Sequence, residues 1–317
     1  MQDSRQVLMS TEGYQAWNRG KQGQGLHWTC DINDELPIKM RSSGEGSERP
    51  FTLCQFFLNA CNSGKERNSM LVERDNKKLV WTWNDYYNQV MAFSKTLNHL
   101  GVTEKSGVAI MGFNSPEWVI AAMGAIMNNN VFTGIYITNT PDACLYQTDH
   151  CDAEIVVVEL AEHLKRFLVN LDKLPKVKAF VVWGETSLPK ECQGSRFYLW
   201  KDFLKLGKDI PLQSITDRMN KQKPGECCCL IYTSGTTGNP KGCMLSHDNL
   251  TWNVCAVSNV NAKSEPSSVG PDNRVVSYLP LSHIAGLVFD VLSHQFNVSE
   301  LYFARPDALQ GSLVETL

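Results

Sequence analysis

From about residue 51 onward, apolar residues recur with two alternating spacings, one typical of helices and one typical of buried strands. Residues three or four positions apart share one helical face, as in the set Val90, Phe93, Leu97 and Leu100. Gly101 then stands where a helix commonly ends, and the apolar residues 108–111 suit a buried strand. The pattern predicts one helix followed by one strand.

The same helix–strand unit recurs further along the chain. Ser115 suits an N-cap and Pro116 a first helical position, so a helix is predicted to run to about Asn128, before a strand over residues 131–137. Another helix is predicted near Pro141. Short apolar strands are predicted over residues 155–158 and 179–183, with an amphipathic helix over residues 160–171 between them. Alternating elements of this kind predict an α/β fold, with largely parallel sheets and helices on both faces.

The later part of the chain is predicted from short apolar runs and from turn residues. The polar stretch 211–225 is interpreted as a surface connection. Residues 308–317 have a helical pattern that reaches Leu317 with no cap or breaker at its end. Further strands are predicted over residues 228–232, 274–278 and 300–303.

A domain division follows from the change in composition along the chain. Residues 1–50 are rich in Gly, Ser, Gln and charge and have no sustained period, so we expect a poorly ordered extension. Residues 51–225 are predicted to form a first α/β subdomain. Residues 226–317 are predicted to begin a second one.

Composition excludes several classes of protein. The 30 Lys and Arg nearly balance the 33 Asp and Glu, so no nucleic-acid partner is expected. Residues 1–10 lack the apolar core of a signal peptide, and no apolar run approaches roughly 20 residues, which predicts a cytoplasmic protein. The 11 cysteines show no C-x-x-C spacing and are interpreted as reduced thiols.

One segment has the composition of an anion-binding loop. Residues 232–242 read Tyr-Thr-Ser-Gly-Thr-Thr-Gly-Asn-Pro-Lys-Gly, with three glycines, four serine or threonine hydroxyls and one lysine. The segment directly follows a predicted strand. Glycines allow backbone N–H groups to approach an anion, hydroxyls add neutral donors, and lysine adds charge. The segment predicts a polyphosphate site, and a glycine-rich surface turn is the alternative interpretation.

The segment is not a Walker A loop. Starting from Gly235, that motif requires a glycine before Lys241 and a serine or threonine after it, but Pro240 and Gly242 stand there. Because proline removes a backbone donor, this loop must hold phosphates in another way.

Four stretches together resemble the adenylate-forming superfamily of acyl-CoA synthetases, luciferases and peptide-synthetase adenylation domains. Residues 232–242 with Met-Leu-Ser-His at 244–247 are similar to its phosphate loop. Residues 277–286, Ser-Tyr-Leu-Pro-Leu-Ser-His-Ile-Ala-Gly, are similar to its next segment. Residues 112–118, and residues 134–139 with Gly-Ile-Tyr and Thr-Asn, resemble the bubblegum-type long-chain acyl-CoA synthetases. The resemblance covers about residues 50–317.

The resemblance implies a long-chain fatty acid:CoA ligase that uses ATP, Mg²⁺ and CoA. A fatty acid carboxylate would attack the α-phosphate of ATP to give acyl-AMP and pyrophosphate, and the CoA thiol would then displace AMP. The loop would cradle the β- and γ-phosphates, the Thr233 hydroxyl would reach Mg²⁺, and His283 would line the acyl pocket. The ATP-binding residues implied are Thr233, Ser234, Gly235, Thr236, Thr237, Gly238, Asn239, Pro240 and Lys241.

Parts of the family pattern have no counterpart in residues 1–317 and are expected beyond Leu317. These are the Tyr-Gly-x-Thr-Glu segment, the later ribose-binding aspartate, and the C-terminal swivelling domain with its lysine. No catalytic residue is therefore assigned, and the chain is expected to be an incomplete N-terminal domain that is inactive alone. Residues 128–130, three consecutive asparagines, also depart from the small residues of the family pattern.

Two other functions stay open at this stage. A short-chain or aryl-CoA ligase would share the loop and differ in pocket shape, and a non-catalytic nucleotide-binding fragment would bind phosphates only. The expected partners are a fatty acid, ATP and CoA, with peripheral membrane contact because the substrate is apolar. The oligomeric state is not predicted.

Overall fold

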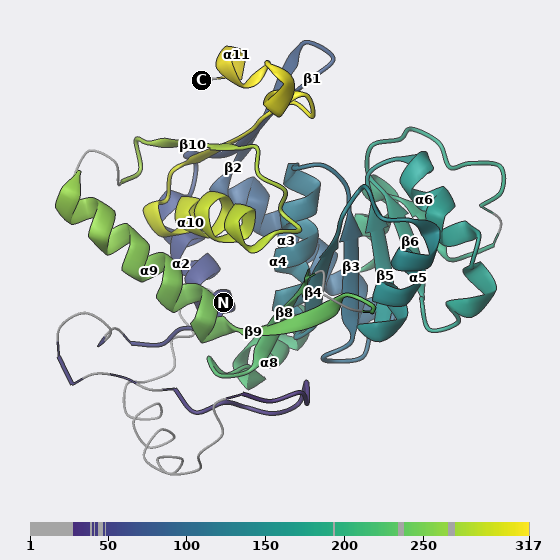
Figure 1. The fold of residues 1–317 in the computed structure, drawn as a ribbon, viewed down its shortest axis with the longest axis horizontal. Coiled ribbons are helices and arrows are strands. Elements are labelled where there is room, and N and C mark those ends of the chain that lie inside the picture. Colours follow the sequence, from purple (N-terminus) through teal and green to yellow (C-terminus); the bar gives the residue numbers. More distant parts are fainter. Residues whose placement is uncertain are drawn as a thin grey trace.

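The structure is a computed structural model, and it describes residues 28–38, 40, 42–43, 47, 49–192, 194–233, 238–265 and 270–316. A seven-stranded sheet with the order β7-β6-β5-β3-β4-β8-β9 forms its centre (Figure 1). Every neighbouring pair is parallel except β8 and β9, which form an antiparallel hairpin. The strands are β3 (Gly107–Met111), β4 (Val131–Ile135), β5 (Ala153–Val158), β6 (Ala179–Val182), β7 (Phe197–Leu199), β8 (Cys227–Thr233) and β9 (Lys241–Ser246).

Helices cover both faces of this sheet, which confirms the predicted fold class. Val108 and Ile110 point into one apolar cluster and Ala109 and Met111 into the other, as the alternation along a strand requires. The first cluster is covered by α2 (Leu53–Gly64), α3 (Trp83–His99), α4 (Pro116–Met127), α8 (Leu212–Lys221) and α9 (His247–Ser264). The second is covered by α5 (Pro141–His150) and α6 (Ala161–Leu168), with the 3₁₀ turn η2 (Leu171–Lys173) beyond them.

The predicted helix boundaries follow from local capping. The Ser115 hydroxyl accepts from the backbone N–H of Trp118, with Pro116 at the first helical position of α4. All of α4 is buried, which explains its almost uniformly apolar sequence. Gly101 follows α3 at φ +62°, a conformation that side chains with a Cβ rarely adopt.

A second, four-stranded sheet joins distant parts of the chain, in the order β10-β11-β1-β2. Its central strands β1 and β11 are parallel, and the Asn68 side chain donates to Glu300, 232 positions away, at 2.9 Å. The predicted boundary at 225/226 does not separate the sheets, because strands from both sides of it occur in each one. The strands are β1 (Asn68–Arg74), β2 (Lys77–Thr82), β10 (Arg274–Ser277) and β11 (Glu300–Phe303).

The predicted surface connection over residues 211–225 is wrong, because most of it is helix α8. Ile215 and Met219, four positions apart, are buried on its inner face, while the remaining face is polar. Two apolar side chains gave too weak a periodicity for a helix to be predicted. The short α7 (Trp200–Leu206) after β7 was also not predicted.

The predicted N-terminal extension differs in part from the structure. Residues 1–27 lie outside the described residues, but residues 28–38 contact the core. The backbone of Glu35 forms an isolated antiparallel β-bridge with that of Glu226. The Glu35 carboxylate pairs with Lys223 at 2.8 Å. Residues 28–38 of the predicted extension therefore belong to the folded structure.

The helix predicted over residues 308–317 is interrupted. Gly311 at φ +138° separates a 3₁₀ turn, η5 (Ala308–Gln310), from α11 (Leu313–Thr316). The prediction carried the helix on to Leu317, but α11 ends at Thr316, and Leu317 lies outside the described residues. The prediction from the apolar pattern missed this break, because a single residue, Gly311, marks it in the sequence.

Between β10 and β11 the chain forms a π-helical segment, η4 (Gly286–Leu292), and then α10 (Ser293–Asn297). Both pack against α9 (Figure 1). Within the part of the chain that the structure describes, none of the helices combines the length and apolarity that crossing a membrane needs.

Candidate functional site

The carboxyl ends of β3, β4 and β8 meet at one edge of the large sheet, because these neighbouring strands are parallel. In open α/β sheets ligands bind in the crevice outside this edge. The four stretches singled out in the sequence begin at or pack against it. The candidate site is therefore this edge.

The predicted phosphate loop connects β8 to β9 as the turn of a hairpin. Thr233 ends β8 and pairs with Lys241, which begins β9, so both ends of the loop are fixed by strand pairing. Both residues are exposed, and Gly238 has φ +80°, which needs glycine. Of the predicted ATP-binding residues, Ser234, Gly235, Thr236 and Thr237 lie outside the described residues.

Aromatic side chains from α5 support the base of this hairpin. The Tyr146 hydroxyl donates to the carbonyl of Pro240 at 3.0 Å. His150 Nδ1 lies 2.8 Å from the Tyr232 hydroxyl, and the Tyr146 and His150 rings lie 5.3 Å apart. Burial raises the pKa of Tyr232, so this phenol stays protonated. Sequence reasoning missed these contacts, although Tyr146 and His150, four positions apart on α5, share one helical face.

The segment 277–286 packs on the end of β4. A Cβ at Gly134 would lie 2.5 Å from Ser282 Cα, so only glycine lets this turn approach so closely. The Asn114 side chain, from the loop after β3, holds the same turn: its amide donates to the Leu279 carbonyl at 2.7 Å, and its oxygen accepts from the Leu281 N–H at 3.3 Å. The structure thus brings three of the four stretches into direct contact.

His283 lies on this turn and is exposed. Its Nδ1 accepts from the backbone N–H of Ala285 at 3.1 Å, and its carbonyl accepts from the N–H of Leu287 at 3.2 Å. The imidazole therefore caps the helical segment that follows, with the tautomer protonated at Nε2. This leaves Nε2 as a donor for another group, while the acyl-pocket role stays a prediction.

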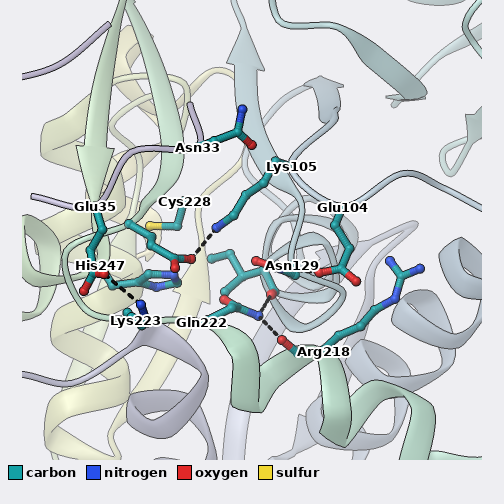
Figure 2. Close-up of polar contacts among 12 residues, drawn as sticks. Asn33, Glu35, Glu104, Lys105, Asn129, Arg218, Gln222, Lys223, Cys228 and His247 are labelled. Carbon is teal, nitrogen blue, oxygen red and sulfur yellow. Dashed lines mark hydrogen bonds and ion pairs between the residues drawn. The ribbon is translucent and has the colours of Figure 1, made fainter. Parts of the chain in front are cut away.

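A buried polar network lies under the start of α9, as Figure 2 shows. His247 Nδ1 accepts from the Leu53 N–H at 3.1 Å, and burial lowers the pKa of this imidazole to about 3. Lys105 pairs with Glu226 at 2.7 Å, with both side chains mostly buried. The His247 contact joins α9 to α2, so this histidine supports the packing of the two helices.

The asparagines at 128–130 form a structural turn between α4 and β4. Asn128 and Asn130 are buried and bonded to each other at 2.7 Å, and Asn130 also donates to the Thr103 carbonyl. Asn129 has φ +63°, a conformation that asparagine tolerates. The departure from the family pattern is thus accommodated by side-chain hydrogen bonds.

A charged cleft of about 920 Å³ lies beside the candidate site, outside the ends of β3, β5 and β6. Arg74 and Glu117 form a bidentate pair across it at 2.8 and 2.6 Å. Glu159 accepts from the Phe113 N–H at 2.7 Å, and burial raises the pKa of that carboxyl. The cleft mixes cations and anions, so its charge does not define a ligand.

The metal prediction rests on one hydroxyl. The described residues contain no group of three or more His, Cys, Asp or Glu side chains that could hold a metal ion. The exposed Thr233 hydroxyl is a hard oxygen donor of the kind that Mg²⁺ accepts, but Mg²⁺ needs six ligands. Thr233 would therefore serve only as one ligand of such an ion, and its other ligands would have to come from a bound phosphate or from water.

The fold and this edge are those of an open α/β protein that binds ligands at the carboxyl ends of its parallel strands. Residues 61–317 match the family model described as AMP-binding enzyme, and the chain belongs to this family. It is 40% identical over 291 residues to the long-chain-fatty-acid–CoA ligase ACSBG2 of Gallus gallus, covering 92% of this chain and 38% of that protein. The human long-chain-fatty-acid–CoA ligase ACSBG1 is 36% identical over 290 residues, and the match covers 92% of this chain and 39% of that protein. The bubblegum-type resemblance is thereby confirmed.

The chain spans about two fifths of the length of these relatives. The family lysine and the Thr-Glu segment, which were expected beyond Leu317, therefore stay predictions about a longer protein. The catalytic assignment for residues 1–317 stays open for the same reason.

Solved structures support the fold alone. The adenylation domain of a carboxylic acid reductase from Segniliparus rugosus, in complex with AMP and a co-purified carboxylic acid, matches with a TM-score of 0.67 at 17% identity. The match covers 84% of this chain and 46% of that one. An anthranilate CoA ligase in complex with anthranoyl-AMP matches with a TM-score of 0.62 at 18% identity, with 80% and 45% covered.

Proposed function

We propose that residues 1–317 are part of a long-chain fatty acid:CoA ligase. This enzyme activates a fatty acid with ATP to acyl-AMP and then transfers the acyl group to CoA. One observation carries the proposal: the loop after β8 and the His283 turn lie over neighbouring parallel strands at one sheet edge. A triphosphate at the loop and a carboxylate at the turn would there be within reach of each other. The similarity to long-chain ligases supports the substrate class.

The residues available support binding more than chemistry. Backbone donors and hydroxyls of residues 233–240 would hold the β- and γ-phosphates, and Lys241 would offset their charge. When bound, Mg²⁺ would neutralise phosphate oxygens, with the Thr233 hydroxyl as one ligand. The His283 Nε2–H would face the acyl site as a donor.

The setting of the reaction is part of the proposal. ATP and CoA are available in the cytoplasm, which is the proposed compartment, and an apolar substrate favours contact with a membrane surface. A short-chain or aryl-CoA ligase remains the alternative substrate class. A panel of acids from acetate and benzoate to palmitate separates them, and a preference for the small acids would exclude the long-chain assignment.

The first experiment is palmitate-dependent ATP–pyrophosphate exchange by the purified, folded chain with Mg²⁺, beside a Lys241→Ala control. Exchange above that control supports acyl-AMP formation by these residues. A folded chain without exchange that still binds ATP in a Lys241-dependent way would be a phosphate-binding part whose chemistry belongs to a longer protein. A chain that shows neither would refute the proposed phosphate site.

A further inference from the structure

The Asn114 side chain, in the loop between β3 and α4, is bonded at every polar atom to residues 277–281. Its amide donates to the Ser277 hydroxyl at 2.9 Å and to the Leu279 carbonyl at 2.7 Å, and its oxygen accepts from the Leu281 N–H at 3.3 Å. Asn114 is 5% exposed. Because the reversed amide would place a donor against the Leu281 N–H, one orientation alone satisfies all three bonds. The side chain thus fixes the end of β10 and the turn after it.

The loop after β3 is itself held on both sides of this asparagine. The Phe113 N–H donates to the Glu159 carboxylate at 2.7 Å, and the Ser115 hydroxyl caps α4. In the first turn of α4, Glu117 pairs with Arg74 of β1 through two hydrogen bonds, at 2.8 and 2.6 Å. A displacement of this loop would break several of these bonds at once, so the loop is a rigid support.

The other side of the turn packs on η4. A Cβ at Gly286, the first residue of η4, would lie 2.6 Å from the Pro280 carbonyl. The buried side chain of Asp290 lies four positions further along η4. The turn and η4 therefore form one packed unit, and its attachment to the large sheet runs through Asn114 and the end of β4.

Rigid strand pairing connects Asn114 to the phosphate loop. β3 pairs with β4 and β4 pairs with β8, and the Thr133 hydroxyl donates to the Leu230 carbonyl across the second pair at 2.8 Å. Thr233, the last residue of β8, begins the loop. The separation between the loop and His283 therefore depends on how the turn is attached at the end of β3.

From these contacts we infer that Asn114 is a positioning residue, which holds the His283 turn at a fixed distance from the phosphate loop. Asn114 does not touch the substrate in this scheme. It aligns a carboxylate at the turn with a triphosphate at the loop, because reacting atoms must come within about 3–3.5 Å of each other. The inference rests on the proposed function only in assigning the turn to the acyl site.

The test removes the bonds of Asn114 in two ways. Asn114→Ala removes the donor and the acceptor together, whereas Asn114→Asp keeps the size of the side chain and replaces its donor by an acceptor. Asn130→Ala is the matched control. Asn130 is also buried and also holds a turn, through its bond to the Thr103 carbonyl, but it precedes β4 and has no bond to residues 277–281 among those that the structure describes.

Two readouts on the full chain separate positioning from folding. The first is the nuclear Overhauser contact between Gly134 and Ser282, which reports the turn seated on the end of β4, because these residues touch there. The second compares kcat/KM for palmitate in pyrophosphate exchange with the Kd for ATP from calorimetry. A displaced turn should alter the first of these quantities and leave the second, which depends on the loop.

Both Asn114 variants should lose the contact between Gly134 and Ser282 and lower kcat/KM for palmitate about tenfold, with the Kd for ATP within about twofold of the natural protein. Asn130→Ala should lower the free energy of unfolding and leave the contact, kcat/KM and Kd unchanged. If Asn114→Ala does not fold, Asn114→Asp decides. A folded Asn114 variant that keeps the contact, or keeps kcat/KM for palmitate, overturns the inference. So does an Asn130→Ala variant that loses the contact.

The Overhauser contact needs no catalysis. If the natural chain shows no exchange, the chemistry proposed for this chain fails, and the contact between Gly134 and Ser282 still decides whether Asn114 positions the turn.

Discussion

The phosphate-loop hairpin and the His283 turn lie at the same sheet edge but are built in opposite ways. The loop is one contiguous, exposed segment, fixed at both ends by pairing of β8 with β9. The turn is held from outside by Asn114 and Gly134, with Asn114 and Leu279 separated by 165 positions. We therefore expect changes in the loop to affect ligand binding alone, whereas changes around the turn should also affect folding stability.

The largest effect expected is the dependence of stability on pH through Asp290. The folded protein raises the pKa of Asp290 from 3.8 to about 7, so the protonated acid favours the folded state. This contribution is complete below pH 4 and is lost as the pH rises towards 7, at most about 4 kcal/mol. Asp290→Asn does not titrate, so its stability relative to the natural protein should increase between pH 4 and pH 8. Urea unfolding at several pH values measures this, and a constant difference would contradict it.

Replacing Lys241 comes next. Lys241→Ala should raise the Kd for ATP about tenfold or more, because a charge-assisted contact with the phosphates, worth about 1.5–3 kcal/mol, is removed. Its free energy of unfolding should change by less than about 0.5 kcal/mol, since the side chain is exposed. Lys208→Ala, at an exposed lysine after α7, is the control and should change neither quantity. A large loss of stability in Lys241→Ala would remove the contrast between the two regions.

A methyl group at Gly134 tests the turn directly. Gly134→Ala should lower the free energy of unfolding by about 2 kcal/mol, because its Cβ meets the Ser282 backbone. Gly242→Ala in β9 is the control: its Cβ would lie an ordinary 3.4 Å from the Tyr232 ring. Equal losses of stability for the two variants would show that the turn can shift to accommodate the methyl group with no change in the free energy of unfolding.

The smallest effect is expected at the support of the loop. Tyr146→Phe removes the hydrogen bond to the Pro240 carbonyl, worth about 1 kcal/mol, so the Kd for ATP should rise roughly fivefold. Tyr198→Phe is the matched control, since that hydroxyl bonds only to its near neighbour Ser195. Calorimetric titration with ATP compares them, and equal affinities would mean that α5 does not shape the loop.

The loop could be predicted from the sequence because its chemistry is contiguous. Strands such as β3 were predictable because burial on both faces makes them uniformly apolar, and α4 because Ser115 and Pro116 mark its start. The hairpin of β1 and β2 was not predicted, since β2 is largely exposed and begins with Lys77 and Lys78.

The contacts of the turn and the support of the loop could not be predicted in the same way. Asn114 and Ser277 are ordinary polar residues until the fold brings them together at 2.9 Å, and a single sequence has no signal for such a contact. Tyr146 and His150 show a helical spacing, but nothing in it identifies Tyr232 or Pro240 as their partners.

The pairing of β1 with β11 has a consequence for the order of folding. The β1–β2 hairpin is synthesised early, but β1 completes its pairing only with residues 301–303. Contacts so distant in sequence close slowly, because the entropy of a long loop is lost before the contact forms. During synthesis, one edge of the early hairpin is therefore exposed until most of the chain has emerged, which makes the smaller sheet the part most open to incorrect strand pairing and to chaperones.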